Sequence, residues 1–133
     1  PGDFLSKKDL KNMNNTSLVL MLHYGSFKML LTGDAEAPVE DALQQKYGTA
    51  LQADVLKIGH HGSSTSSSQA FLDAVQPKAV VISLGKNNDY GHPHRETMQR
   101  LKKLGTEIYR TDELGTVRML FTESEVRLLK GSK

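Results

Sequence analysis

The chain has 133 residues, the size of a single domain, and its 17 basic and 15 acidic side chains give a formal net charge of +2. It contains no cysteine, which excludes a disulfide framework and a thiolate zinc site. The balanced charge does not indicate a nucleic-acid-binding protein, and no apolar run reaches the length of a membrane span. The first residues show no targeting signal and no initiating methionine, so we expect a piece of a longer polypeptide.

The chain begins with a polar segment and a predicted β-hairpin. Residues 1–13 are rich in Lys and Asn, and we expect an irregular lead-in. The apolar runs Ser17–His23 and Phe27–Gly33 flank a short turn that contains Gly25. Two such runs around a glycine turn predict two antiparallel strands.

Strands then alternate with single helices, and three short strands end the chain. Start and stop signals, including Ser68 as an N-cap and Gly48 and Gly105 as C-caps, predict helices over 34–48, 68–77 and 93–105. The other predicted strands cover residues 53–59, 78–85, 107–111, 115–121 and 125–130. This order predicts an α/β fold, or in the wider sense α+β, with a mixed sheet and helices on one face.

Residues with useful chemistry follow the ends of three predicted strands. Asp34 follows one strand, His60 and His61 follow the next, and His92 and His94 come after a third. Ligands bind at the carboxyl ends of strands in open α/β sheets, so we expect these side chains at one edge.

Asp34 and the histidine pair also have plainer interpretations. Asp34 could be only the N-cap of the helix that follows it. His60 and His61 could satisfy loop carbonyls, although two adjacent histidines before a glycine favour a functional role. His23 lies inside a predicted strand, and we interpret it as structural.

The segments after the histidine pair admit two interpretations each. The run Ser63–Ser68 could be a linker, but a strand and a helix bracket it closely, and its hydroxyls and N–H groups fit an anion site. The His-x-His spacing of His92 and His94 suggests a metal pair, yet Pro93 argues against a central strand. We therefore expect phosphate-facing groups or a proton donor, with His92 near the N-cap of the next helix and His94 in its first turn.

Three blocks of the sequence, residues 14–36, 53–85 and 88–94, together resemble the metallo-β-lactamase domain of the ComEC competence family. That family comprises membrane channels that take up single-stranded DNA. Its superfamily folds as an αββα sandwich that carries two metal ions, usually zinc or manganese. The resemblance implies that residues 14–133 form the C-terminal half of such a sandwich.

The resemblance also implies roles for individual residues. Asp34 matches the catalytic carboxylate that bridges the two metals. One of His60 and His61 matches a metal ligand and the other would touch the substrate, and the sequence does not decide between them. His92 matches a catalytic histidine near the scissile phosphate. The other candidate substrate-binding residues are Ser63, Ser64 and His94.

The sequence lacks the family's His-x-His-x-Asp-His motif and a further ligand histidine. Because tetrahedral zinc takes three or four protein ligands, we expect this chain alone to hold little or no metal and to hydrolyse nothing. The missing N-terminal half of the domain is then its first partner. The sheet face and edge left exposed without it would favour a non-native dimer.

The function that follows from the resemblance is metal-dependent hydrolysis by a phosphodiesterase or nuclease linked to DNA uptake. The chain would be a soluble, extracytoplasmic domain of a bacterial integral membrane protein, with the channel domain and DNA as further partners. Two alternatives remain. One is a soluble metallo-hydrolase that acts on a small phosphoester, and the other is a non-catalytic module that binds an anion or a partner.

Overall fold

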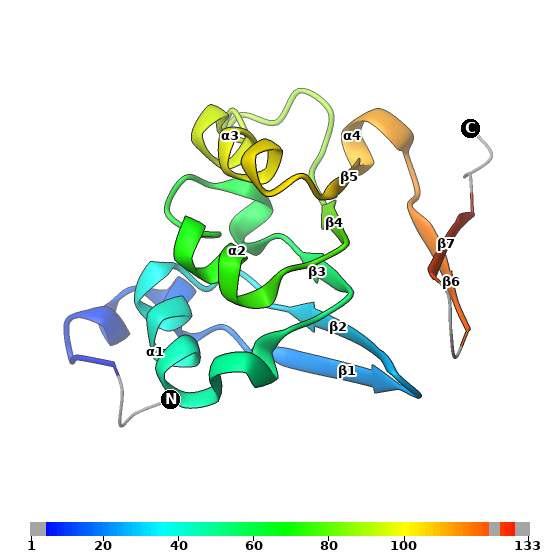
Figure 1. Ribbon diagram of the computed structural model, residues 1–133. Coiled ribbons are helices and arrows are strands. Elements are labelled where there is room, and N and C mark those ends of the chain that lie inside the picture. Colours follow the sequence, from blue (N-terminus) through cyan, green and yellow to red (C-terminus); the bar gives the residue numbers. More distant parts are fainter. Residues whose placement is uncertain (1–4, 123–125, 130–133) are drawn as a thin grey trace.

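The computed structural model describes residues 5–122 and 126–129, and Figure 1 shows their arrangement. In chain order the elements are η1 (Asp9–Lys11), η2 (Met13–Thr16), β1 (Leu20–Tyr24), β2 (Phe27–Leu31), α1 (Ala37–Tyr47), η3 (Gly48–Leu51), β3 (Val55–Lys57), η4 (Gly59–Gly62), α2 (Gln69–Val75), β4 (Ala79–Ile82), α3 (Arg95–Leu104), β5 (Glu107–Arg110), α4 (Thr111–Leu114), β6 (Arg118–Phe121) and β7 (Val126–Leu129). Residues 1–4 of the predicted lead-in and both ends of the predicted strand 125–130 lie outside the described residues.

The main sheet has five strands in the order β1-β2-β3-β4-β5. β1 and β2 form the predicted antiparallel hairpin, and β2, β3, β4 and β5 run parallel to one another. The predicted α/β class and mixed sheet are therefore confirmed. β6 and β7 pair only with each other and form a separate two-stranded sheet.

The signals that predicted the helices act as expected at most ends. The Ser68 hydroxyl accepts a hydrogen bond from the backbone N–H of Phe71 and caps α2. Gly48 and Gly105 are the C-caps of α1 and α3, both with positive φ. The N-cap of α1 is Glu36, however, so the interpretation of Asp34 as only a helix cap is wrong.

The chain also turns where we expected it to stay extended. Residues Thr111–Leu114 form the short helix α4, although Thr111 was expected to end a strand. Arg110 donates to the carboxylate of Asp112 through Nε at 3.0 Å and also pairs with Glu113. These local ion pairs lie within the turn and stabilise it.

The helices α1, α2 and α3 cover one face of the main sheet (Figure 1). Their apolar residues and alternate residues of the strands share one core: Leu30, Leu51, Ala53, Leu56, Ile58, Phe71, Leu72, Val75, Val80, Ile82 and Leu101. The prediction of helices against one face is confirmed. Within the described ranges, no helix has the length and apolar character needed to cross a membrane.

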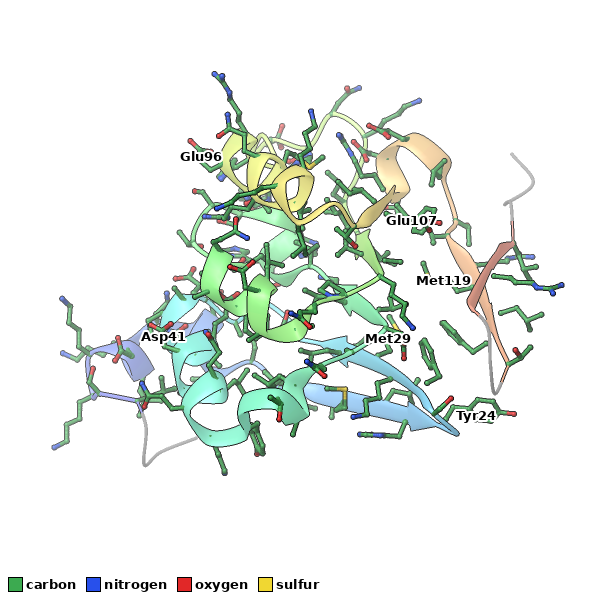
Figure 2. The ribbon with its side chains drawn as sticks, viewed as in Figure 1. Tyr24, Met29, Asp41, Glu96, Glu107 and Met119 are labelled. Atoms are coloured by element: carbon green, nitrogen blue, oxygen red, sulfur yellow. The ribbon has the colours of Figure 1, made fainter. Side chains whose placement is uncertain are left out.

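The hairpin of β6 and β7 lies over the opposite face of the sheet. Phe121 stacks on Phe27 with ring centroids 4.0 Å apart. Figure 2 labels Met29 and Met119, which both pack on the buried residues of this second face. A predominantly parallel sheet is normally buried on both faces, and here the hairpin provides part of the second cover.

The outer part of this second face is exposed. Leu20, Leu22 and Tyr24 of the edge strand β1 are 51%, 49% and 57% exposed. They are paired with Leu31, Met29 and Phe27, and paired residues project to the same side of a sheet. An apolar stripe on β1 thus continues the face that β6 covers.

Replacing Phe121 with Ala should lower the free energy of unfolding by about 2 kcal/mol, because it uncovers the buried ring of Phe27. Leu120 on the same strand is half exposed, and Leu120→Ala is the matched control, with an expected change under about 0.5 kcal/mol. Urea unfolding of the purified chain measures both. Equal losses for the two variants would contradict the assignment of Phe121 as the contact between hairpin and sheet.

Candidate active site

The loops that follow β2, β3 and β4 meet at one edge of the sheet and enclose a pocket of about 510 Å³. Its lining residues are Asp34, His60, His61, Ser83, Leu84, Gly85, Asn88, Tyr90 and His92. The structure thus brings together four of the residues singled out in the sequence: Asp34, His60, His61 and His92. His23 lies in β1 and does not line this pocket.

Backbone hydrogen bonds fix the ends of β2 and β3 relative to each other. The N–H of His60 donates to the carbonyl of Gly33 at 3.0 Å. The N–H of Asp34 donates to the hydroxyl of Ser17 at 3.1 Å. The carboxylate of Asp34 is left half exposed, with Oδ1 at 3.6 Å from Nε2 of His61.

The ring of His61 has a defined orientation and tautomer. Its Nδ1 lies 2.6 Å from the carbonyl oxygen of Ser83. A carbonyl only accepts, so Nδ1 carries the proton, and in the neutral ring Nε2 keeps its lone pair on the side of Asp34. Metal-ligating histidines typically donate their other N–H to a carbonyl or carboxylate in this way.

Thr111 holds the segment that orients His61. Its hydroxyl accepts from the N–H of Leu84 at 2.8 Å and donates to the carbonyl of the same residue at 2.7 Å. The carbonyl of Ser83, which precedes Leu84, is therefore fixed in place. This support reaches the pocket from the start of α4.

His60 is oriented by a different set of neighbours. Its Nδ1 lies 3.4 Å from Oε1 of Glu36 and 3.5 Å from the hydroxyl of Thr65. The carboxylate of Glu36 in turn accepts from the side-chain amides of Asn12 and Asn14, at 2.8 and 3.0 Å. Asn12 of the predicted lead-in and Asn14 just after it thus have a structural role, because they hold the carboxylate that faces His60.

Three consecutive residues of the pocket loop are in the left-handed region. The φ values are 47° for His60, 53° for His61 and 88° for Gly62. Such a conformation costs about 1–3 kcal/mol for a residue other than glycine, and it persists only where the surroundings impose it. Gly62 also allows a close approach, since a Cβ there would lie 2.7 Å from the Cβ of Pro93.

The serine-rich run is fixed by side chains from α1 and α3. The buried carboxylate of Glu40 accepts from the N–H groups of Ser67 and Ser68. Arg100 donates through Nη2 to the carbonyls of Ser64 and Ser66, at 3.2 and 3.0 Å. These contacts make the run a braced support for the pocket loop rather than a free linker.

The environment of Glu40 is a balance of opposing effects. Burial raises the pKa of its carboxyl group, while the N–H groups of Ser68 and Ser67 and the charge of Arg100 act in the opposite direction. Because the N–H groups of Ser67 and Ser68 are occupied by Glu40, they do not offer the anion site that the sequence suggested.

The helix that follows the pocket begins later than predicted. His94 is the N-cap of α3, which starts at Arg95, so the placement of His94 in the first turn is wrong by one residue. The N–H of Ser64 donates to Nδ1 of His94 at 3.0 Å, and Nε2 lies 3.2 Å from the carbonyl of Tyr90. Because a carbonyl only accepts, Nε2 carries the proton, and Nδ1 is the acceptor for Ser64. Both ring nitrogens of His94 are thus engaged in hydrogen bonds.

His94, Ser63 and Ser64 do not line the pocket. Ser63 is buried, and its hydroxyl contacts the hydroxyl of Thr65 at 3.0 Å. The observed contacts of these three residues are structural ones within the loops. Their role in substrate binding stays a prediction.

The surroundings of His92 disfavour a positive charge on its ring. Burial and the nearby imidazoles of His94, His60 and His61 lower the pKa of His92, and Asp34 opposes this effect. His92 is therefore neutral at physiological pH, able to donate one hydrogen bond and accept another. Burial also lowers the pKa of Lys57, again opposed by Asp34.

Sequence reasoning missed Glu36, Ser83 and Tyr90. Glu36 lies two residues after Asp34, and its position in the block residues 14–36 was a usable signal. Ser83 contributes only its backbone carbonyl. Every residue has such a carbonyl, so the residue type gave no signal. Tyr90 stands two residues before His92, and its exposure could not be foreseen.

The described residues do not make a complete metal site. Across residues 5–122 and 126–129, no group of three or more His, Cys, Asp and Glu side chains could hold a metal ion. Asp34 and His61 offer two donors facing each other, fewer than a structural or catalytic zinc site uses.

The fold agrees with the comparisons with known proteins. The sequence model of the metallo-β-lactamase superfamily matches residues 2–86. The chain belongs to this superfamily, whose members usually bind divalent metals, and membership supports hydrolytic chemistry in general.

Among three relatives of the chain, two have names that refer to competence or to the ComE operon, and the third is named for recombination. The chain is 40% identical to ComE operon protein 3 of Bacillus subtilis over 87% of its length, 41% identical to competence protein ComA of Neisseria gonorrhoeae over 86%, and 36% identical to recombination protein 2 of Haemophilus influenzae over 86%. The resemblance to the ComEC competence family is therefore confirmed. The matched part covers only 16%, 17% and 14% of these relatives.

Replacing Gly62 with Ala should destabilise the chain by about 2 kcal/mol or more, because strain at positive φ adds to a clash with Pro93. Gly91→Ala is the matched control, since Gly91 also has positive φ but a Cβ there meets nothing within 4 Å. Urea unfolding of both variants gives the difference. Equal destabilisation of the two variants would show that the close approach of Gly62 to Pro93 does not affect the free energy of unfolding.

Proposed function

We propose that this chain supplies one wall of the active site of a metal-dependent phosphodiesterase that acts on DNA. The observation that carries the proposal is the orientation of His61, with Nδ1–H on the carbonyl of Ser83 and Nε2 facing Asp34 Oδ1 at 3.6 Å. A carboxylate and an unprotonated imidazole nitrogen that face each other form part of a ligand set for zinc or manganese.

The same geometry supports a division of labour between the adjacent histidines. His61 has the carbonyl partner typical of a metal ligand. His60 has its Nδ1 turned to Glu36 and lies edge-on to His92, with ring centroids 5.7 Å apart. We therefore assign metal binding to Asp34 and His61, and contact with a phosphate oxygen to His60 and His92.

The remaining metal ligands must come from outside the described residues. We assign them to a preceding segment of the same polypeptide, which would also cover the apolar stripe on β1. Without that segment, the chain has only two of the metal-binding side chains and leaves one face of the sheet exposed. The exposed face would promote self-association of the chain at high concentration. Whether residues 14–133 correspond to half of a domain stays a prediction.

The names of the relatives support a role in DNA uptake. Two of the three are named for competence or its operon, and one for recombination. We propose that the parent protein spans a bacterial membrane and holds this domain on the extracytoplasmic side, next to its channel. The DNA strand that is not imported would then be the substrate.

Metal binding by the chain alone should be weak and should depend on Asp34 and His61. Asp34→Ala and His61→Ala should each lower the affinity for Mn²⁺ or Zn²⁺ about tenfold, or about 1.4 kcal/mol, in calorimetric titrations with the metal alone. His23→Ala, an exposed histidine in β1, is the matched control and should leave the affinity unchanged. A loss in His60→Ala but not in His61→Ala would reverse the assignment.

Hydrolysis is tested with labelled single-stranded DNA and either metal. The chain alone should cleave nothing, and a longer polypeptide that includes the preceding segment should cleave it in an Asp34-dependent manner. Asp34-dependent cleavage by the chain alone would contradict the incomplete site. Cleavage by the longer polypeptide that survives Asp34→Asn would contradict the proposed function.

A further inference from the structure

Tyr90 is an exposed aromatic side chain at the rim of the candidate active site. It lines the pocket and is nevertheless 78% exposed. Its ring stacks on that of His92, with centroids 5.7 Å apart and planes 19° from parallel. His92 thus covers one face of the tyrosine ring, and the high exposure leaves the other face open.

The loop that carries Tyr90 is held in place on both sides. The side chain of Asn88 accepts from the N–H of His92 at 2.9 Å and donates to its carbonyl at 2.8 Å. The carbonyl of Tyr90 accepts from Nε2 of His94 at 3.2 Å. Tyr90 is therefore presented from a short closed loop between β4 and α3 (Figure 1).

The ring of His92 is itself supported by two further imidazoles. His60 and His94 approach it edge-on, with centroids 5.7 and 4.7 Å away and both planes at 69° to it. Edge-to-face contacts of this kind stabilise the orientation of aromatic rings. The pair of Tyr90 and His92 is consequently a preorganised flat surface next to the pocket.

We propose that Tyr90 is a specificity-determining residue, a platform on which a nucleobase stacks beside the phosphate held at the pocket. The inference rests on the proposed function for the position of the phosphate. Bases stack readily on single aromatic side chains in single-stranded nucleic acids, because every base offers a π-face. A base in a duplex is already stacked, so the platform favours single strands.

A small phosphoester with a choline-like cation fits this surface less well. Quaternary ammonium groups are recognised by several aromatic faces that surround them. Among the residues that line the pocket, Tyr90 is the only Phe, Tyr or Trp. The single open ring face of Tyr90, next to an open pocket, instead suits the flat ring of a nucleobase.

The test compares two labelled strands of equal length and charge, a single-stranded oligodeoxythymidylate and an abasic strand with the same sugar–phosphate backbone. Binding to the purified chain is measured without metal, at low salt, by fluorescence anisotropy. The wild type should bind the oligodeoxythymidylate more tightly than the abasic strand. Tyr90→Ala should weaken binding of the former about tenfold, or about 1.4 kcal/mol, within the range of a base–aromatic stack.

The control variants separate stacking from other roles. Tyr90→Phe keeps the ring and should stay within twofold of the wild type. Tyr47→Ala removes an exposed tyrosine at the end of α1, away from the pocket, and should have no effect. Circular dichroism of each variant checks that the fold is retained.

Three results would overturn the proposal. They are equal or undetectable binding of the two strands by the wild type, equal loss of both strands in Tyr90→Ala, and a preference for phosphocholine over the oligodeoxythymidylate. Hydrolysis by the longer polypeptide is independent of these outcomes. Failure of base stacking is therefore distinguishable from failure of the proposed phosphodiesterase function.

Discussion

The structure of the site depends on the left-handed backbone of His60 and His61, imposed where β3 ends. This conformation turns the two adjacent rings to different neighbours, one to Ser83 and Asp34 and the other to Glu36. The free-energy cost of this strained backbone is a sizeable fraction of the small net free energy of unfolding of a single domain. The serine-rich run, braced by Glu40 and Arg100, supplies the surrounding order that keeps the loop in place.

The rest of the fold positions this loop among its neighbours. Parallel pairing of β2, β3 and β4 brings the three following loops to one edge. The helices bury one face of the sheet, while the other is covered in part by β6 and leaves the stripe on β1 exposed. The proposed preceding segment would both cover the exposed stripe on β1 and add metal ligands to Asp34 and His61.

Much of the fold could be predicted from the sequence, because local signals decide it. Ser68 begins α2, and Gly48 and Gly105 end α1 and α3, through contacts within a few residues. Short apolar runs place the strands. The start of α3 was misjudged, since the contact of His94 with Ser64 joins residues far apart in the chain and depends on the fold. α4 was missed although the ion pairs of Arg110 that stabilise it are local. In the site, strand order placed Asp34, His60, His61 and His92 together. The orientation of the rings follows from backbone carbonyls such as that of Ser83, which residue identity does not encode.

The tautomer of His61 tests the central claim most directly. Long-range ¹H–¹⁵N correlation spectra of the imidazoles, recorded about two pH units above the ordinary histidine pKa, report which nitrogen carries the proton. The account predicts a single Nδ1–H tautomer for His61, with Nε2 unprotonated, whereas the exposed His23 serves as an unconstrained reference. An Nε2–H tautomer, or the averaged signals of a freely exchanging ring, would contradict the account.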